Sequence, residues 1–309
     1  MIVLTKRHAG NPDQVHCVLV FGLGLIGKNI LAALGHTGLY DSEDFAFRWG
    51  SPTEADIRPI RDLVADRCQS GRIDLVWSAG NSGFSSPEEE FAREIVSFRS
   101  VLGLCRDITL GKPNTKLSFH IISSAGGLFE GQTNVDQQRK PVPLRPYGRV
   151  KLMQENELLK LAELMQISIY RPSSVFGFAG PTARRGLIDS LFFNSAINKV
   201  TNIFGSPDTL RDYVFVKDIG RFIASRVVDG KPGGIFLLAS GKPSSVSEVI
   251  HAVEAALNRK IYRRHDTSGL NAANMSFNRH ALPEDWNPTD LATGVRSTRL
   301  LVKAYTELS

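Results

Sequence analysis

Residues 16–35 read HCVLVFGLGLIGKNILAALG, and this stretch decides the fold of the chain. It begins with an apolar run that ends at Gly22, which is the pattern of a short strand buried on both faces. Beyond the glycines, Ile26, Ile30 and Leu34 follow at helical spacing. The stretch therefore predicts a buried parallel strand, a tight glycine-rich turn and a helix, in that order.

The turn carries three glycines, Gly22, Gly24 and Gly27, in the spacing GxGxxG. In a dinucleotide-binding turn the first glycine permits a tight bend, the second lets the backbone approach a pyrophosphate, and the third lets the helix pack against the strand. The amide groups and the dipole at the start of the helix favour a phosphate anion there. We therefore predict a cofactor-binding turn that includes Leu25 and Ile26, although an ordinary strand–helix turn could also use these glycines.

The alternation of strand-like and helix-like segments continues as far as Arg171. Strands are expected at 45–49, 75–77, 117–122 and 167–170, and helices at 60–68, from Ser86 onward with the apolar face Phe91, Ile95, Phe98 and Leu102, and at 147–165. Ser86, Pro87 and Glu89 have the spacing of a capping box with proline at the first helical position. Alternating strands and helices predict an α/β fold, a Rossmann-type doubly wound parallel sheet with helices on both faces.

Beyond Arg171 glycine and proline become frequent and the expected elements become shorter. Helices are expected at 187–198, 219–228 and 246–257, the last with a capping box of Ser245 and Glu248, and strands at 213–216 and 235–238. We predict a dinucleotide-binding domain over residues 1–172. A smaller C-terminal α/β substrate lobe would occupy residues 173–309 and would be interleaved with the last strands of the sheet.

The composition is that of an ordinary globular protein. Of the 309 residues 42% are hydrophobic and 22% are charged, and the net charge of +6 is spread along the chain without a basic run that would bind nucleic acid. Cys17, Cys68 and Cys105 are far apart, so neither a disulfide framework nor a metal site is expected. No apolar segment has the length of a signal peptide or a membrane span, which makes the reducing cytoplasm the default expectation.

Two further segments carry groups suited to proton transfer. Tyr147 and Lys151 are four residues apart, so on a helix they share one face, where the ammonium favours the phenolate form of the tyrosine. Ser123 and Ser124 follow the strand expected at 117–122, and ligands bind at the carboxyl ends of parallel strands. Each pattern is common alone, but with the glycine turn they predict redox chemistry on a nicotinamide dinucleotide. His120, inside an apolar strand, is interpreted as a core histidine with satisfied hydrogen bonds.

The choice between NAD and NADP depends on the end of the second strand. An acidic residue that binds the ribose 2′-hydroxyl is expected about 20 residues after the glycine turn. The chain has Phe47, Arg48 and Trp49 in this region. An arginine suits a 2′-phosphate better, so Arg48 favours NADP over NAD. An equally acceptable interpretation is that Arg48 points into solvent.

Together these segments resemble the extended short-chain dehydrogenase/reductases, in particular the NAD-dependent epimerase/dehydratase group that acts on nucleotide sugars. The resemblance covers nearly the whole length. It rests on GLGLIG (22–27), DIR (56–58), VWSAG (76–80), SSAGGLFEG (123–131), PLRPYGRVKL (143–152), RPSSVFG (171–177), RDYVFVKD (211–218) and DWNPTDLATGVRST (285–298). Such a set is far more specific than any one of its motifs.

The resemblance implies roles for particular residues. Tyr147 would be the catalytic acid/base, Lys151 its partner, and Ser124 the third member, with Ser123 as the alternative. Besides the glycine turn, the residues implied for the cofactor are Asp56 and Ile57 at the adenine, and Ala79 and Gly80 in the strand-end segment beside the cofactor. The residues implied for the nucleotide-sugar substrate are Arg211 at the diphosphate, Ser174 and Asn81. A homodimer formed through a helix pair is also implied, with no membrane partner.

The chain departs from the family pattern in ways that bear on the reaction. The family usually has glycine at the place of Phe21, and its sugar dehydratases carry an Asp-Glu pair where this chain has Ala125 and Gly126. The absence of that pair disfavours a dehydratase. The leading hypothesis is an NAD(P)-dependent nucleotide-sugar epimerase that acts by transient hydride transfer. The alternatives are an NADPH-dependent reductase of a keto-sugar nucleotide and, from another class, a non-catalytic cofactor-sensing protein.

Overall fold

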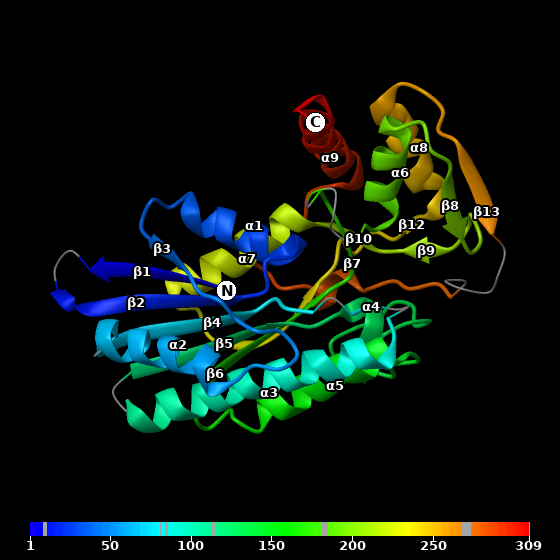
Figure 1. Cartoon of the computed structure of the whole chain (residues 1–309). Helices are drawn as coiled ribbons and strands as arrows, with labels where there is room; N and C mark the ends of the chain where they lie inside the picture. Colours follow the sequence, from blue (N-terminus) through cyan, green and yellow to red (C-terminus); the bar gives the residue numbers. More distant parts are fainter. Residues whose placement is uncertain are drawn as a thin grey trace. The chain divides into compact units, whose positions relative to one another are not determined.

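The computed structural model describes residues 1–8, 11–68, 70–80, 82–83, 86–112, 115–178, 180, 185–266 and 273–308. The chain forms two compact units (Figure 1). The first unit consists of Met1–Leu128, Pro143–Arg171 and Gly220–Phe236, and the second of Phe129–Val142, Pro172–Ile219 and Leu237–Ser309. Each unit therefore combines segments that are distant in the sequence.

The first unit is built on a seven-stranded sheet with the strand order β11-β6-β5-β4-β2-β1-β3 (Figure 1). The strands are β1 (Ile2–His8), β2 (Asn11–Phe21), β3 (Asp41–Asp44), β4 (Ser70–Trp77), β5 (Thr115–Ile122), β6 (Gln166–Pro172) and β11 (Gly234–Leu238). β2, β4, β5 and β6 pair in parallel, whereas β1 is antiparallel to both β2 and β3. The predicted Rossmann-type, mostly parallel sheet is confirmed.

Helices cover both faces of this sheet. They are α1 (Leu25–Gly35), α2 (Glu54–Arg67), α3 (Glu88–Gly111), the short α4 (Ala125–Leu128), α5 (Pro146–Leu159) and α7 (Val216–Asp229). α2, α3 and α5 lie on one face, and α1 and α7 lie on the other (Figure 1). Strand side chains alternate between the faces, and those facing α2, α3 and α5, such as Leu19, Leu75 and Phe119, form a continuous apolar core. Burial of each such side chain contributes about 1.5–3 kcal/mol.

The predicted strand at 45–49 is wrong, and the strand Ile2–His8 was not foreseen. β1 forms an antiparallel hairpin with β2 and so occupies the edge on which the next strand would pair. The strand after α1 is therefore Asp41–Asp44, which pairs with β1. Phe47, which lies after this strand, is buried because its side chain packs on the sheet and not because its backbone pairs in it: the ring centroids of Phe47 and Phe21 are 5.2 Å apart.

One predicted helix cap is wrong and another is confirmed. The N-cap of α3 is Pro87, and the Ser86 hydroxyl instead accepts a hydrogen bond from the Gly83 amide at 2.9 Å. At the start of α8 (Val246–Leu257) the capping box forms as predicted. There the Glu248 amide donates to the Ser245 hydroxyl at 3.1 Å, and the Ser245 amide donates to the Glu248 carboxylate at 2.7 Å.

The described residues of the second unit form short two-stranded sheets and three longer helices. Its strands are β7 (Ser174–Phe176), β8 (Thr201–Phe204), β9 (Leu210–Arg211), β10 (Tyr213–Phe215), β12 (Ser244–Ser245) and β13 (Arg263–Asp266), and its longer helices are α6 (Leu187–Ala196), α8 and α9 (Leu291–Leu308). A separate apolar core, which includes Phe176, Leu191, Val249 and Val295, fills this unit. None of the helices in the described part of the chain combines the length and apolar character that a membrane span requires.

Candidate functional site

The glycine turn connects β2 to α1, and two of its glycines are required by the packing of the chain itself. Gly22 has a φ of +95°, and a Cβ atom there would overlap the backbone of Ser78 and Ala79. A Cβ atom at Gly27 would overlap the carbonyl oxygen of Gly22. These glycines therefore let the turn lie against the end of β4 and let α1 pack against the turn.

Gly24 is different, because the fold gives no reason for a glycine there. Apart from Gly24 itself and its neighbours along the chain, no atom of the described residues lies within 4 Å of the position where its Cβ would be. Gly24 is the N-cap of α1, where no side-chain cap is formed and the first turn carries no acidic residue. The exposed amides of this turn suit an anion, and the missing side chain leaves room for it. The observed geometry thus fits a dinucleotide pyrophosphate.

The segment after β4 forms the neighbouring wall of the turn. The Ser78 hydroxyl donates a 2.6 Å hydrogen bond to the carbonyl of Gly22, which fixes the end of β4 against the turn. Ala79 is buried, and Gly80 has a φ of +139°, a backbone conformation that side chains disfavour. Asn81, predicted to bind substrate, lies outside the described residues.

Two glycines bring the tyrosine of α5 against the serine loop. A Cβ atom at Gly127 would meet the Tyr147 ring at 2.9 Å, and one at Gly148 would overlap the Gly127 carbonyl. The small-residue run after Ser124 therefore allows α4 and α5 to pack in close contact. This packing places Tyr147 beside the loop that carries the two predicted serines.

The two serines are used differently by the fold. The Ser124 hydroxyl accepts a 3.0 Å hydrogen bond from the Gly127 amide and so caps α4. The Ser123 hydroxyl is buried and has no hydrogen-bond partner among the described residues, while the Ser123 amide donates to the Tyr170 carbonyl at 2.7 Å. Burial of an unpaired hydroxyl is unfavourable, which makes Ser123 as good a candidate as Ser124 for a ligand contact.

Lys151 lies one turn after Tyr147 on α5 and is almost completely buried, with 5% of its surface exposed. Its ammonium nitrogen lies 5.9 Å from the centre of the Tyr147 ring. The same nitrogen donates to Glu94 Oε1 at 2.8 Å and to Gln154 Oε1 at 3.3 Å. The predicted Tyr147–Lys151 pair thus exists in the structure, together with a buried carboxylate that the motif does not include.

Glu94, on α3, was not identified from the sequence. It lies three residues after Phe91 and four before Phe98, so it falls on the predicted apolar face of that helix. A charged residue at such a position was the available signal, because buried acids are rare unless they are paired.

The ion pair keeps both of its members charged despite their burial. Burial alone would lower the pKa of Lys151, but the surrounding acidic groups, Glu94 first among them, together outweigh this effect and raise the pKa. Burial alone would raise the pKa of Glu94, but the charge of Lys151 and hydrogen bonds from Lys151, Ser82 and Gln154 lower it. A fully charged pair is therefore expected at neutral pH.

On the adenosine side, the predicted residues already have partners within the chain. The Asp56 carboxylate accepts hydrogen bonds from the Thr53 amide at 2.8 Å and from the Arg48 amide at 3.1 Å, within the capping box of α2. The Ile57 amide donates to the Thr53 carbonyl at 3.2 Å, and its side chain is buried. The Arg48 side chain is exposed. Contacts of these residues with adenine or a 2′-phosphate remain predictions.

Arg211 and Ser174 belong to the second unit. An Arg211 guanidinium nitrogen donates to the carbonyl of Ala273 and, at 3.1 Å, to that of Leu210. Ser174 is half-buried in β7, and its amide donates to the Asp212 carbonyl at 2.9 Å. The roles of Arg211 and Ser174 toward a substrate also remain predictions.

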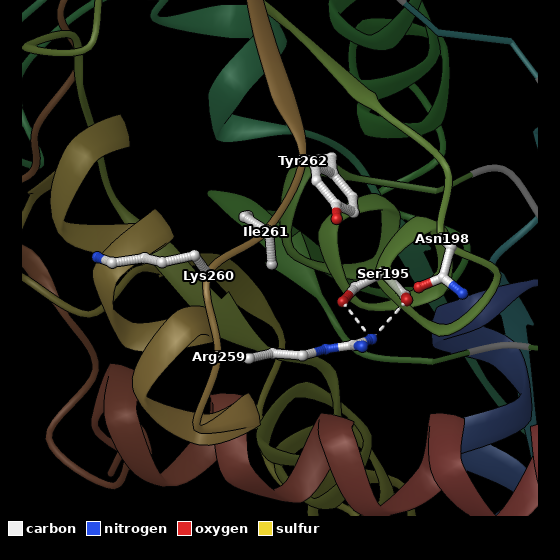
Figure 2. Close-up of a pocket in the computed structure, with 6 residues that line it drawn as sticks. All are labelled: Ser195, Asn198, Arg259, Lys260, Ile261 and Tyr262. Carbon is white, nitrogen blue, oxygen red and sulfur yellow. Dashed lines mark hydrogen bonds between the residues drawn. The ribbon is translucent and has the colours of Figure 1, made fainter.

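A pocket in the second unit contains none of the predicted site residues. It has a volume of about 240 Å³ and is lined by Ser195, Asn198, Arg259, Lys260, Ile261 and Tyr262 (Figure 2). The Arg259 guanidinium donates to the Ser195 carbonyl at 2.6 Å and to the Ser195 hydroxyl at 2.8 Å. These bonds tie the segment after α8 to α6, so the arginine has a structural use here. In the described part of the chain no cluster of His, Cys, Asp or Glu could hold a metal ion.

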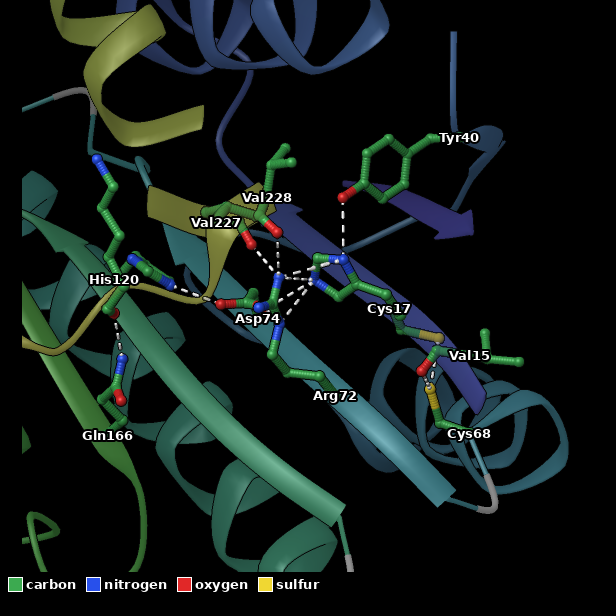
Figure 3. A network of polar contacts seen from close by, with 12 residues as sticks. Val15, Cys17, Tyr40, Cys68, Arg72, Asp74, His120, Gln166, Val227 and Val228 are labelled. Carbon is green, nitrogen blue, oxygen red and sulfur yellow. Dashed lines mark hydrogen bonds and ion pairs between the residues drawn. The ribbon is translucent and has the colours of Figure 1, made fainter. Parts of the chain in front are cut away.

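A second buried polar cluster, the Asp74 cluster, lies on the face of the sheet toward α1 and α7 (Figure 3). The Asp74 carboxylate contacts His16 Nε2 at 2.6 Å, His120 Nε2 at 2.8 Å and Arg72 Nε at 2.8 Å. The second ring nitrogen of His120 lies 2.9 Å from the Tyr170 hydroxyl. His120 is therefore a core histidine with both nitrogens satisfied, as the sequence indicated.

Comparison with known proteins places this architecture in a family. Residues 18–239, about seven tenths of the chain, match the family described as NAD dependent epimerase/dehydratase. A "Putative UDP-glucose 4-epimerase" of Methanocaldococcus jannaschii is 30% identical over 142 residues, which are 43% of this chain and 45% of that protein. A "dTDP-4-dehydro-6-deoxyglucose reductase" of Escherichia coli is 28% identical over 178 residues, which are 55% of this chain and 56% of that protein. The match thus spans about half the length of these curated relatives.

Solved structures of similar fold support the same conclusion. The structure of a UDP-glucose-4-epimerase from Stenotrophomonas maltophila aligns with a TM-score of 0.75 at 19% identity, over 94% of this chain and 99% of that chain. That of a UDP-glucose 4-epimerase from Thermus thermophilus aligns with a TM-score of 0.72 at 18% identity, over 93% and 99%. At such identities the likeness establishes the fold. By its family match and its fold, the chain belongs to the NAD-dependent epimerase/dehydratase family of enzymes, among the extended short-chain dehydrogenase/reductases.

Proposed function

We propose that this chain is an NAD(P)-dependent nucleotide-sugar epimerase that acts by transient hydride transfer, as a homodimer. The observation that carries the proposal is the packing of the Tyr147 ring on Gly127, three residues after Ser124, with the Lys151 ammonium 5.9 Å from the ring centre. A phenol, a buried cation and serine hydroxyls thus gather beside the end of β5. The M. jannaschii relative, whose printed name is a UDP-glucose 4-epimerase, supports the choice of reaction.

The residues suited to the dinucleotide are those of the glycine turn and its surroundings. The open space at Gly24 and the uncapped amides at the start of α1 would hold the pyrophosphate. Ala79 and Gly80, at the end of β4 against the turn, would lie beside the dinucleotide, and Arg48, Asp56 and Ile57 would contact its adenosine half. When bound, the nicotinamide would supply a site that accepts a hydride from a sugar carbon and returns it.

The chain's own residues would handle the proton and the orientation of the sugar. Tyr147 would take the proton of the sugar hydroxyl as its carbon is oxidised and give it back after the keto sugar has turned over. The positive charge of Lys151 would stabilise the phenolate during that exchange. The hydroxyl of Ser124 or Ser123 would donate a hydrogen bond to the reacting oxygen. Arg211 would bind the diphosphate, and Ser174 and Asn81 would contact the sugar nucleotide.

A net reductase is the second candidate, because the E. coli relative bears the name of a keto-sugar nucleotide reductase. The two functions differ in how they use the cofactor. An epimerase regenerates its dinucleotide in every cycle, whereas a reductase consumes one NADPH for each molecule of product.

The test is to purify the protein, identify co-purifying small molecules by mass spectrometry, and incubate it with UDP-glucose. Conversion to the C4 epimer without added cofactor would support the epimerase. Stoichiometric oxidation of added NADPH in the presence of a keto-sugar nucleotide would instead establish the reductase and overturn the proposal.

Tyr147→Phe tests the mechanism directly. The variant keeps the ring that packs on Gly127 but loses the hydroxyl, so we expect dinucleotide binding to persist and turnover to fall by about 10²–10⁴-fold. Turnover at the rate of the unaltered protein would show that another group moves the proton.

A further inference from the structure

Lys151 is held in a closed group of four side chains, the Glu94 cluster, which consists of Ser82, Glu94, Lys151 and Gln154. Glu94 Oε1 accepts hydrogen bonds from Lys151 at 2.8 Å and from the Gln154 amide at 3.1 Å. Glu94 Oε2 accepts a short hydrogen bond from the Ser82 hydroxyl. Glu94, Lys151 and Gln154 are all less than 9% exposed. The cluster thus joins α3, α5 and the segment after β4 through one carboxylate.

The backbone around this carboxylate is shaped to receive it. A Cβ atom at Gly80 would lie 2.8 Å and 2.9 Å from the two carboxylate oxygens of Glu94. Gly80 also has a φ of +139°, so a side chain is excluded on both grounds. The glycine that ends the segment 76–80 therefore leaves the space in which the Glu94 carboxylate lies.

The position of Glu94 determines what electric field Tyr147 experiences. An ammonium alone beside the phenol would strongly favour loss of the phenol proton, whereas an ammonium paired with a carboxylate presents a nearly neutral pair. The other acid that acts on Lys151 is Glu155 of α5, whose carboxylate receives two hydrogen bonds from Arg171, at 3.0 Å and 2.6 Å. Arg171 largely neutralises Glu155, so Glu94 is the carboxylate that balances Lys151.

We propose that Glu94 is a positioning residue of the Tyr147–Lys151 pair. It fixes the Lys151 ammonium near the Tyr147 ring and sets the pH at which the pair exchanges its proton. Two of the three ammonium donors are used by Glu94 and Gln154, which leaves one for a ligand hydroxyl or the phenol. The catalytic role of Glu94 rests on the proposed function, whereas its effect on the proton exchange of Tyr147 can be measured in the protein without substrate or cofactor.

Glu94→Gln removes the negative charge and keeps the shape of the side chain. Loss of a nearby negative charge makes every neighbouring group release its proton more readily, so the titrations of both Tyr147 and Lys151 move to lower pH. We expect the Tyr147 phenolate to form about one pH unit lower than in the unaltered protein. A purely structural role for Glu94 would lower stability without moving this titration.

The measurement is the ultraviolet absorbance of the phenolate in the free protein. Subtracting the titration of the matching Tyr147→Phe protein isolates Tyr147, both in the unaltered background and with Glu94→Gln. The control is Glu90→Gln, which makes the same charge change one turn earlier on α3 at an exposed position and should produce no shift. A shift with Glu94→Gln no larger than that of the control would overturn the proposal.

Glu94→Asp keeps the test decisive if the glutamine variant does not fold. It retains the charge but withdraws the carboxylate from Lys151, so a shift of the same sign and smaller size is expected. No shift with the aspartate variant would also contradict the proposal. Because no substrate is used, failure of the epimerase assay would leave this result intact, and a negative titration result would leave the epimerase proposal standing.

Discussion

Two polar regions of the first unit differ in how completely the fold satisfies their polar groups. One is the Asp74 cluster, and the other is the site formed by the glycine turn, the serines and the Tyr147–Lys151 pair. In the Asp74 cluster the carboxylate binds His16, His120 and Arg72 (Figure 3). The second nitrogens of the two histidines contact Tyr40 and Tyr170, each at 2.9 Å. The cluster is closed within the chain.

At the site formed by the glycine turn, the serines and the Tyr147–Lys151 pair, two groups have no use in the described fold. Gly24 faces open space among the described residues, and the buried Ser123 hydroxyl has no partner within them. The difference indicates that buried charge alone does not mark a functional site. What marks it is a set of groups that the chain positions but does not satisfy, since unsatisfied buried groups cost free energy unless a ligand uses them.

The largest expected effect is a loss of stability when the carboxylate of the Asp74 cluster is removed. Asp74→Ala removes the acceptor shared by His16, His120 and Arg72, which leaves buried donors without a partner. We expect the free energy of unfolding to fall by about 3–5 kcal/mol in urea denaturation at neutral pH. The control is Asp107→Ala, which breaks a half-exposed pair with Arg61 and should cost at most about 1 kcal/mol. A similar small loss for both variants would mean that the cluster rearranges without its carboxylate.

Within the glycine turn, Gly27 is required by packing and Gly24 is not, so alanine substitutions at the two positions should differ in their effects on stability and on cofactor binding. Gly27→Ala should lower the free energy of unfolding by about 1–3 kcal/mol, because the new methyl overlaps the Gly22 carbonyl. Gly24→Ala should change it by no more than about 0.5 kcal/mol. The same Gly24 variant should bind NAD at least about tenfold more weakly in calorimetric titration, a loss of about 1.4 kcal/mol. An unchanged NAD affinity in Gly24→Ala would show that the pyrophosphate does not bind at this turn.

The two serines allow a sharper distinction. Ser124→Ala removes the hydroxyl that caps α4 and should cost about 1 kcal/mol. Ser123→Ala removes a buried hydroxyl that lacks a partner and should leave stability unchanged or slightly higher. Thermal unfolding measures both effects, and turnover of the same two proteins identifies the serine that contacts substrate. A clear loss of stability in Ser123→Ala would show that the fold does use that hydroxyl.

The smallest expected effect is a pH dependence of stability from the closed cluster. Burial lowers the pKa of His16 below its ordinary value, so the unfolded chain takes up this proton first as the pH falls below about 6.5. Burial would raise the pKa of Asp74, but hydrogen bonds from His120 and His16 hold it well below its ordinary value. Its stabilisation is therefore present above about pH 4 and lost below it.

Urea unfolding at a series of pH values measures this dependence. Stability should decline from pH 7 to pH 5 and more steeply under acid conditions. His16→Asn should flatten the first part of the decline and leave the second. An identical slope in both proteins between pH 7 and pH 5 would exclude His16 as the titrating group.

Local sequence patterns determined much of this protein. The apolar run before Gly22, the helical spacing after it and the capping box at Ser245 each depend on neighbours within a few residues, and the structure contains all three. The motif positions likewise identified Tyr147, Lys151 and the serine loop, and their gathering near α4 follows from the order of strands in a parallel sheet.

Only the tertiary structure decided which groups are satisfied. The strand Ile2–His8 pairs with β2 and β3 and so displaced the strand expected at 45–49, because the choice of strand partner is a long-range competition that a local pattern does not contain. Glu94 approaches Lys151 from a helix 57 residues away in sequence, and Asp74 gathers partners from neighbouring strands. Spacing within the sequence places a side chain on a face, but the partner it meets there depends on how distant segments pack.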